Sequence, residues 1–498
     1  MLASMFASGP PRRLLTPAAA SLACLLAAAG CADSGSPQSV DPPISRQGPA
    51  QPTTRPAGQF TKEGWFGTAD GLHARLEIRS VERQSAKTVL SYTVTSLDNA
   101  TKSIPFTLAL LDPVGRKLYR PLGTQPGATP QNIQFAPGTS RDLTAEFPPI
   151  PATVQRITVL SLGTAGEYTG VPVTGRGDSP TPTTTSTPAQ PTNPLDLYDI
   201  TESAVKDVAA SGNDVKVNLR ADVLFESGSA ELTERAKQVL DQAAQEIRSQ
   251  GDPSRGPITI SGHTDSQGSD ADNLTLSKER AEAVREELEK RLGATYRYTS
   301  QGKGETELIA KEGGSDDAQA RARNRRVEIA YIVRQQTPGA TTASGRGTTA
   351  APATFRASDG RTVASRYATF GEEKNKRRLD VKPFYRDGAY LVAVFELVNE
   401  GPGTIPPDAV YPHKDYLGGA FTSFSVSVPG STDVYRAVRI GPPAANSATY
   451  VDPGRATFRT AANEPIRGFV YIPAPPGAPS TVVFDAGPFG KVDNVPVS

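Results

Sequence analysis

An acidic turn that runs into an amphipathic helix carries the residues best suited to chemistry. In 261-SGHTDSQGSDADNLTLSKERAEAVREELEKRLG-293, Asp265 follows a strand, and Arg280 stands fifteen residues later in the first turn of a helix expected from about Ser277. An ionised carboxylate only accepts hydrogen bonds, whereas a guanidinium donates a planar fork of them. Taken alone, Asp265 could simply stabilise its turn and Arg280 could be a surface residue. The pair therefore has to be weighed with the pattern around it.

Catalytic and metal chemistry find little support in this turn. His263 lies close to Asp265, but no Gly-x-Ser-x-Gly elbow or placed nucleophile accompanies it, so we expect a structural histidine. The acids of the turn, Asp265, Asp270 and Asp272, lack the spacing and the terminal Glu of an EF-hand loop. The whole chain holds 2 Cys and 3 His. We therefore predict that the protein is not an enzyme and has no metal site and no cofactor.

The length and net charge of the chain limit its possible domain organisation and partners. A chain of 498 residues is too long for a single core, so several domains are expected. Lys+Arg total 53 against 52 for Asp+Glu, which gives a net charge of +1. Such a balance provides no bulk attraction for nucleic acid.

The N-terminus has the features of an export signal. Arg12 and Arg13 precede an apolar run that ends in small residues, so residues 1–30 are predicted to be a signal peptide. The run 28-AAGC-31 resembles a bacterial lipobox, although Ala28 stands where that pattern prefers Leu, Val or Ile. Lipidation would explain why Cys31 is the single Cys of the mature chain. The alternative is ordinary signal cleavage, which leaves a free thiol.

Pro-, Thr-, Ser- and Gly-rich stretches divide the mature chain into folded blocks, because such compositions bury too little apolar area to fold. We expect linkers at residues 31–59, 174–195 and 335–355. The folded blocks are then residues 60–173, 196–334 and 356–498.

The first and third blocks both show alternating strand patterns, as in 89-VLSYTVTS-96 and 390-YLVAVFELVN-399. They also share short motifs in a common order. The run 118-LYRPL-122 corresponds to 434-VYRAV-438, and 171-VPV-173 corresponds to 495-VPV-497. We predict two all-β immunoglobulin-like sandwich domains, the second a diverged copy of the first.

The central block alternates strand and helix patterns. Strands are expected at 214–225, 257–262 and 324–333, and helices at 231–250 and from about 277; the run 297-RYTSQGKGE-305 lies between the second helix and the final strand. The order βαβαβ predicts an α+β domain with its helices on one face of a sheet.

The motifs of this block resemble the OmpA C-terminal-like domain. They are the turn after Phe225, 262-GHTD-265, 276-LSKERA-281, Gly302-Lys303-Gly304 and 324-NRRVEI-329, in the family's order and near its spacing. The resemblance covers about a quarter of the chain. Domains of this family bind peptidoglycan in outer-membrane proteins, peptidoglycan-associated lipoproteins and flagellar stator proteins.

The resemblance implies a ligand and a set of site residues. The ligand is meso-diaminopimelate of the peptidoglycan stem peptide, whose side chain ends in an ammonium and a carboxylate on one carbon. Asp265 would accept from the ammonium, and Arg280 would grip the carboxylate, assisted by an adjacent helix N-terminus. The supporting residues implied are Ser227 and Gly228 for backbone contacts, Asn273 for the pocket rim, and Asn324 and Arg325 at the start of the last strand.

These inferences predict an exported, lipid-anchored protein of the cell envelope that binds peptidoglycan non-covalently and links membrane to cell wall. The Ala-, Gly-, Pro- and Arg-rich style suggests a high-GC actinobacterium; in a Gram-negative host the anchor would lie in the outer membrane. The alternative is a cell-surface scaffold whose β domains bind a protein partner, with the central domain serving only as a wall address.

Overall fold

The structure is a computed structural model of the chain. It describes residues 58–67, 71–123, 132–175, 194–310, 312–313, 317–334, 350–371, 375–401, 410–413, 416, 418–441, 448–454 and 462–498. The predicted signal peptide, Cys31 and most of the three predicted linkers lie outside these residues.

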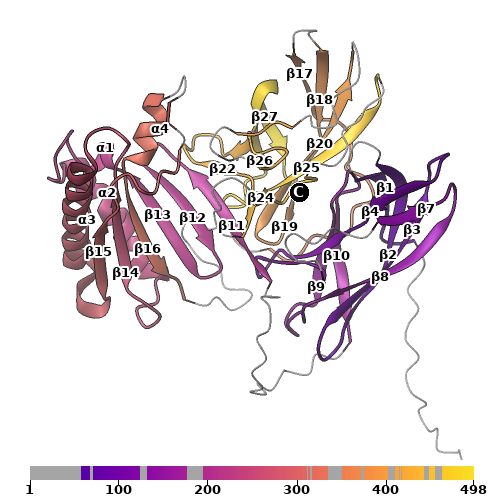
Figure 1. Cartoon of the computed structure of the whole chain (residues 1–498), viewed down its shortest axis with the longest axis horizontal. Coiled ribbons are helices and arrows are strands. Elements are labelled where there is room, and N and C mark those ends of the chain that lie inside the picture. Colours follow the sequence, from indigo (N-terminus) through magenta and orange to yellow (C-terminus); the bar gives the residue numbers. More distant parts are fainter. Residues whose placement is uncertain are drawn as a thin grey trace, which may run out of the picture. The chain divides into compact units, whose positions relative to one another are not determined.

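The first block is β-rich (Figure 1). One antiparallel sheet has the order β1 (Thr61–Phe66), β2 (Leu72–Arg83), β3 (Thr88–Ser96), β8 (Ser140–Phe147). A second has the order β6 (Lys117–Tyr119), β5 (Leu108–Asp112), β9 (Arg156–Ser161), β10 (Glu167–Thr174). β4 (Lys102–Pro105) pairs with β7 (Asn132–Phe135). The buried side chains of both sheets form one apolar core that includes Leu76, Tyr92 and Val159.

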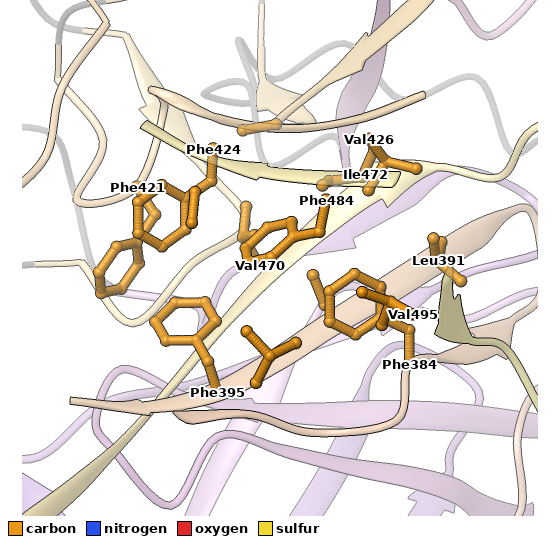
Figure 2. Packing of buried hydrophobic residues seen from close by; sticks show 14 of the residues in the cluster. Phe384, Leu391, Phe395, Phe421, Phe424, Val426, Val470, Ile472, Phe484 and Val495 are labelled. Atoms are coloured by element: carbon orange, nitrogen blue, oxygen red, sulfur yellow. The ribbon is translucent and has the colours of Figure 1, made fainter. Parts of the chain in front are cut away.

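The third block is also β-rich. One sheet has the order β17 (Ala364–Phe370), β18 (Asn375–Val381), β20 (Tyr390–Asn399), β25 (Pro465–Pro473), with β19 (Tyr385–Asp387) on β20. The other has the order β22 (Val434–Arg436), β21 (Phe424–Ser427), β26 (Thr481–Ala486), β27 (Lys491–Pro496). β23 (Arg439–Ile440) pairs with β24 (Thr449–Tyr450), and η2 spans Gly487–Phe489. Figure 2 shows the aromatic core, in which Phe395 and Phe484 both pack against Phe424.

The pairing order of the two β blocks is the same. Antiparallel β1-β2-β3-β8 corresponds to β17-β18-β20-β25, and β6-β5-β9-β10 corresponds to β22-β21-β26-β27. Two of the shared sequence motifs fall on matching strands. Tyr119 and Tyr435 lie on β6 and β22, and the Val-Pro-Val runs lie on β10 and at the end of β27.

The central block is a mixed sheet with helices. Its elements are β11 (Leu195–Glu202), β12 (Lys206–Ser211), β13 (Asp214–Arg220), α1 (Ala221–Leu224), α2 (Glu234–Gln250), β14 (Ile258–His263), α3 (Asp270–Leu292), η1 (Gly293–Thr295), β15 (Tyr298–Gly302), α4 (Asp317–Asn324) and β16 (Arg326–Ile332). The strand order is β11-β12-β13-β16-β14-β15, antiparallel except for β14 and β15. α2 and α3 lie side by side, and their apolar faces share one core with the sheet (Figure 1).

Several predicted boundaries are wrong. The chain leaves the sheet after Arg220 and forms α1, where a strand to residue 225 was expected, because the ladder with β16 ends at the Arg220–Arg326 pair. α2 starts at Glu234 because the Thr233 side chain caps it, accepting from the Ala236 N–H at 3.1 Å. α4 was missed, so the last strand begins at Arg326 and not at residue 324.

The start of α3 matters most for the site. Ser269 caps the helix by accepting from the Asp272 N–H at 3.2 Å. Asp270 and Asp272, expected to lie in the turn, belong to the first helical turn, where acids complement the helix dipole. Arg280 is therefore in the third turn of α3, about 15 Å along the axis from the N-terminus.

The three blocks are joined by β11 and by shared apolar surface. Leu195 and Asp196 pair with β6, the middle of the strand pairs with β23 and β12, and Thr201 and Glu202 pair with β22. One apolar cluster draws side chains from β5, β6 and β9 of the first block and from β20 and β25 of the third. Phe355, assigned to a linker by composition, packs against Phe60 with ring centroids 5.0 Å apart.

Candidate functional site

The acidic turn between β14 and α3 holds Asp265 in a fixed position. Asp265 is 8% exposed. Its Oδ2 accepts from Arg325 at 2.6 Å, and its Oδ1 accepts from the Gln267 N–H at 3.2 Å. One carboxylate oxygen is thus committed to an arginine, while the other makes a single long contact to its own turn.

Arg280 projects from α3 toward the turn that follows Phe225. Its Nε donates to the Ser229 carbonyl at 2.9 Å, and its guanidinium lies over the Phe225 ring, 5.2 Å from the centroid. Among the described residues, neither terminal nitrogen of Arg280 has a hydrogen-bond partner, and neither is sealed from solvent. Burial lowers the pKa of this guanidinium. A buried, anchored arginine with its fork unused is suited to a carboxylate.

Arg325 ties two acids together. It donates through Nε and one terminal nitrogen to both oxygens of Asp222, at 2.8 and 2.5 Å, and through the other to Asp265. The hydrogen bonds to Asp222 and Asp265 raise the pKa of Arg325 above its usual value. Asp222 and Asp265 also act electrostatically on Arg280. Two acids and two arginines therefore form one cluster at this end of the domain.

Asn273, the fourth residue of α3, braces the acidic turn. Its amide donates to the Gln267 carbonyl at 3.1 Å and to the Glu305 carboxylate at 2.7 Å. Ser227 and Gly228 lie in an exposed turn, and Gly228 has a φ of 71°. That turn leads directly to Ser229, whose carbonyl anchors Arg280.

Asn324 is fully buried and acts on a neighbouring loop. Its side-chain oxygen accepts from the Ile309 and Ala310 N–H groups, both at 2.9 Å. Its amide donates to the Ala310 carbonyl and to Glu312, and Glu312 in turn accepts from Ser266 of the acidic turn. Asn324 thus supports the turn through the loop and does not itself face solvent.

The surroundings of the site differ in two ways from what the sequence predicts. The N-terminus of α3 does not lie beside Arg280, so the helix cannot add N–H groups at that point. Asp222 and Glu312 were not singled out in the sequence. Asp222 was assigned to a strand that was expected to reach residue 225, and no local pattern marks Glu312. Asp222 acts on the turn only through Arg325, and Glu312 contacts Ser266 from a loop distant in sequence.

His263 takes no part in this cluster. It ends β14, is 1% exposed, and neither ring nitrogen has a hydrogen-bond partner among the described residues. Burial, assisted by Arg326, lowers its pKa to about 3, so the ring is neutral at physiological pH. No group of three His, Cys, Asp or Glu side chains that could hold a metal ion occurs in the described parts of the chain.

None of the helices described by the structure is both long enough and apolar enough to span a membrane. Lipidation at Cys31 falls outside the described residues.

Comparison with known proteins places this site in a family. Residues 224–325 match the OmpA family and form an OmpA family domain. Over 117 residues the chain is 37% identical to outer membrane protein A of Bordetella avium, covering 24% of this chain and 57% of that protein. Over 76 residues it is 50% identical to the photosystem I P700 chlorophyll a apoprotein A2 of Gloeobacter violaceus, covering 15% of this chain and 9% of that protein.

Part of the chain also matches a solved structure. The peptidoglycan-associated lipoprotein from Burkholderia pseudomallei is 27% identical, with 22% of this chain and 88% of that chain covered and a TM-score of 0.19. The chain spans less than two thirds of the two curated relatives.

Proposed function

We propose that the OmpA family domain binds peptidoglycan non-covalently through the diaminopimelate of the stem peptide, without catalysis. The observation that carries this proposal is the unused guanidinium fork of Arg280, held near the Asp265 carboxylate. Arg280 donates its fork to the ligand carboxylate, and Asp265 accepts from the ligand ammonium through Oδ1. The exposed turn at Ser227 and Gly228 offers backbone groups beside Arg280.

The remaining predicted residues have indirect roles in this proposal. Arg325 orients Asp265 and balances its charge, and Asp222 in turn orients Arg325. Asn273 and Asn324 hold the acidic turn and the loop against it. Two charge-assisted contacts of about 1.5–3 kcal/mol each give an affinity in about the micromolar to millimolar range per stem. A dense wall and a tether raise the effective concentration enough for retention.

The test is sedimentation of residues 56–498, which form one compact unit, with purified diaminopimelate-type peptidoglycan, and with lysine-type peptidoglycan as the ligand control. Arg280→Ala and Asp265→Ala should each lose about 2–5 kcal/mol of binding free energy, because the opposite charge of the ligand is left unpaired. Arg280→Lys should also bind poorly, since a point charge cannot replace the fork.

The matched control is Arg285→Ala. Arg285 is on the same helix but pairs with Glu282 and Glu289. The Arg285→Ala variant should bind peptidoglycan like the wild type. Sedimentation of Arg280→Ala and Asp265→Ala at the wild-type level, or no binding by the wild type, would refute the proposal.

We further propose that Cys31 carries a lipid and that the chain links a membrane of the cell envelope to the wall. The support is the export signal and the lipobox-like run in the sequence. Metabolic labelling with a radioactive fatty acid should mark the full chain in its host, and Cys31→Ser should abolish the label. A labelled Cys31→Ser chain would argue against this site.

We also propose that the two β blocks are diverged copies of one immunoglobulin-like sandwich. The matching strand orders and the placement of Tyr119 and Tyr435 on corresponding strands support this.

A further inference from the structure

A buried polar cluster joins the OmpA family domain to the third block. Glu202, the last residue of β11, forms an ion pair with Arg323 at 3.0 Å and accepts a hydrogen bond from Arg436 at 2.8 Å. Tyr416 of the third block donates to the same carboxylate and accepts from Arg323 at 2.8 Å. The Arg323 guanidinium also lies over the Tyr416 ring, 5.3 Å from its centroid.

Most of the cluster is shielded from solvent. The side chains of Arg323 and Glu202 are 8% and 13% exposed. Burial would raise the pKa of Glu202, but Arg436 and Arg323 outweigh it and keep the pKa below its usual value. Glu202 is therefore ionised, and the charges are compensated inside the cluster, where a lost partner is costly.

Arg323 immediately precedes, in the sequence, two residues that hold the site in place. Asn324 follows it and holds the Ile309 and Ala310 N–H groups. Arg325 comes next and holds Asp265. The end of α4 is thus fixed on one side by Tyr416 and on the other by the acidic turn.

We propose that Tyr416, acting through Arg323 and Glu202, is a positioning residue for the ligand site, so that the third block contributes to wall binding without touching the ligand. This inference rests on the proposed peptidoglycan binding for its functional consequence. When a hydrogen-bonded network holds site residues in place, removing one member of the network makes the positions of those residues less well defined.

The first test needs no ligand. Hydrogen exchange of the Ile309 and Ala310 amides in residues 56–498 should be about three- to tenfold faster in Tyr416→Phe, because one net hydrogen bond of the cluster is lost. Tyr367→Phe is the matched control, since this tyrosine of the same block is 53% exposed. Arg323→Lys removes the guanidinium that contacts Glu202 and Tyr416, and it should speed exchange of the same two amides.

The second test is binding to diaminopimelate-type peptidoglycan. Tyr416→Phe and Arg323→Lys should weaken binding about three- to tenfold when each is measured at a temperature at which the variant is fully folded. If the wild type binds and both variants match Tyr367→Phe in exchange and in binding, the positioning role is wrong. If the wild type does not bind, the proposed function fails, and the exchange rates alone decide whether Tyr416 positions the loop.

Discussion

Arg280 shows how a single residue is prepared for a ligand. Its Nε is used by the Ser229 carbonyl and its face by Phe225, so the side chain is ordered before any ligand arrives. The entropy of ordering a long side chain, up to about 2 kcal/mol, has then been paid in folding and does not reduce binding. Lysine offers neither the fork nor the flat face that packs on an aromatic ring.

Asn324 has the opposite character, because all its contacts are internal. Asn324→Ala would leave the Ile309 and Ala310 N–H groups without their acceptor in a buried place. We expect a loss of about 2–4 kcal/mol, measured as the free energy of opening of the central block by native-state hydrogen exchange. Gln242→Ala, on the exposed side of α2, should stay within about 0.5 kcal/mol. A neutral Asn324→Ala would mean that water replaces the lost bonds.

At the scale of elements, α3 is held close to the sheet by small residues. A Cβ on Gly262 of β14 would lie 1.9 Å from the Ser277 carbonyl oxygen, and one on Gly302 of β15 would lie 2.7 Å from the Lys278 nitrogen. Ser277 is fully buried at this crossing, and its hydroxyl accepts from the Gly304 N–H at 2.9 Å. Arg280 stands about one turn further on, so the crossing sets its height above the sheet.

Gly262→Ala should therefore push α3 away from β14. We expect about 3 kcal/mol of destabilisation of the central block, together with weaker wall binding, because the clash is with backbone and cannot be relieved by a rotamer. Gly256→Ala is the control, since its added Cβ would meet the flexible end of Ile332 at 3.1 Å. Unfolding followed by hydrogen exchange would show the difference; equal stability of the two variants would contradict a tight crossing.

At the scale of the molecule, the two β blocks bury charge between them. The Glu167 side chain is 0% exposed and binds Arg467 of the third block at 2.6 Å, Tyr385 at 2.6 Å and Lys62 at 3.4 Å. Burial would raise the pKa of Glu167, but Arg467 and Lys62 lower it to about 2. The blocks are thus joined by charge pairing as well as by a shared apolar cluster.

Glu167→Gln should leave one buried positive charge of Arg467 and Lys62 uncompensated, because Asp359 pairs with Arg467 alone. We expect a loss of about 3–5 kcal/mol, seen as a lower midpoint of thermal unfolding at pH 7. Glu146→Gln removes an exposed partner of Lys87 and should cost at most about 1 kcal/mol. A small effect at Glu167 would show that the two blocks separate readily in solution.

Asp387 gives the same interface a pH dependence of opposite sign to that of Glu167. Burial raises the pKa of Asp387 to about 6, against hydrogen bonds from Ala353, Thr158 and Tyr471. The folded state then binds this proton more tightly than the unfolded state, where the pKa of Asp is about 3.9. The contribution of Asp387 to stability is therefore greatest below about pH 4 and falls as the pH rises to about 6.

Asp387→Asn should remove the loss of stability that Asp387 causes as the pH rises. This loss is up to about 3 kcal/mol between pH 4 and pH 7. Thermal unfolding of wild type and variant across this range measures it as a change in slope. Asp452, whose pKa burial also raises to about 6, remains in both proteins and leaves part of the slope. Glu167, with its pKa near 2, adds no slope above about pH 5. Identical slopes would contradict the role of Asp387.

The sequence alone determined what depends on local pattern. The strand periodicity of both β blocks, the alternation of strands and helices in the central block, and the motif of Asp265 and Arg280 are all carried by neighbouring residues. The apolar residues that recur at helical spacing along α2 are buried, with Val239 partly so. Exact helix ends were poorly predicted, because Ser269 and Thr233 compete with other polar residues nearby for the capping position.

Tertiary structure alone decided what depends on residues far apart in the chain. The partnership of Arg325 with Asp222, the burial of Glu167 by Arg467, and the pairing of β11 with strands of the first and third blocks join segments about 80 to 300 residues apart. No local periodicity encodes such contacts, since each side chain by itself resembles an ordinary surface charge. Burial by a distant segment turns these charges into parts of the site and of the interface.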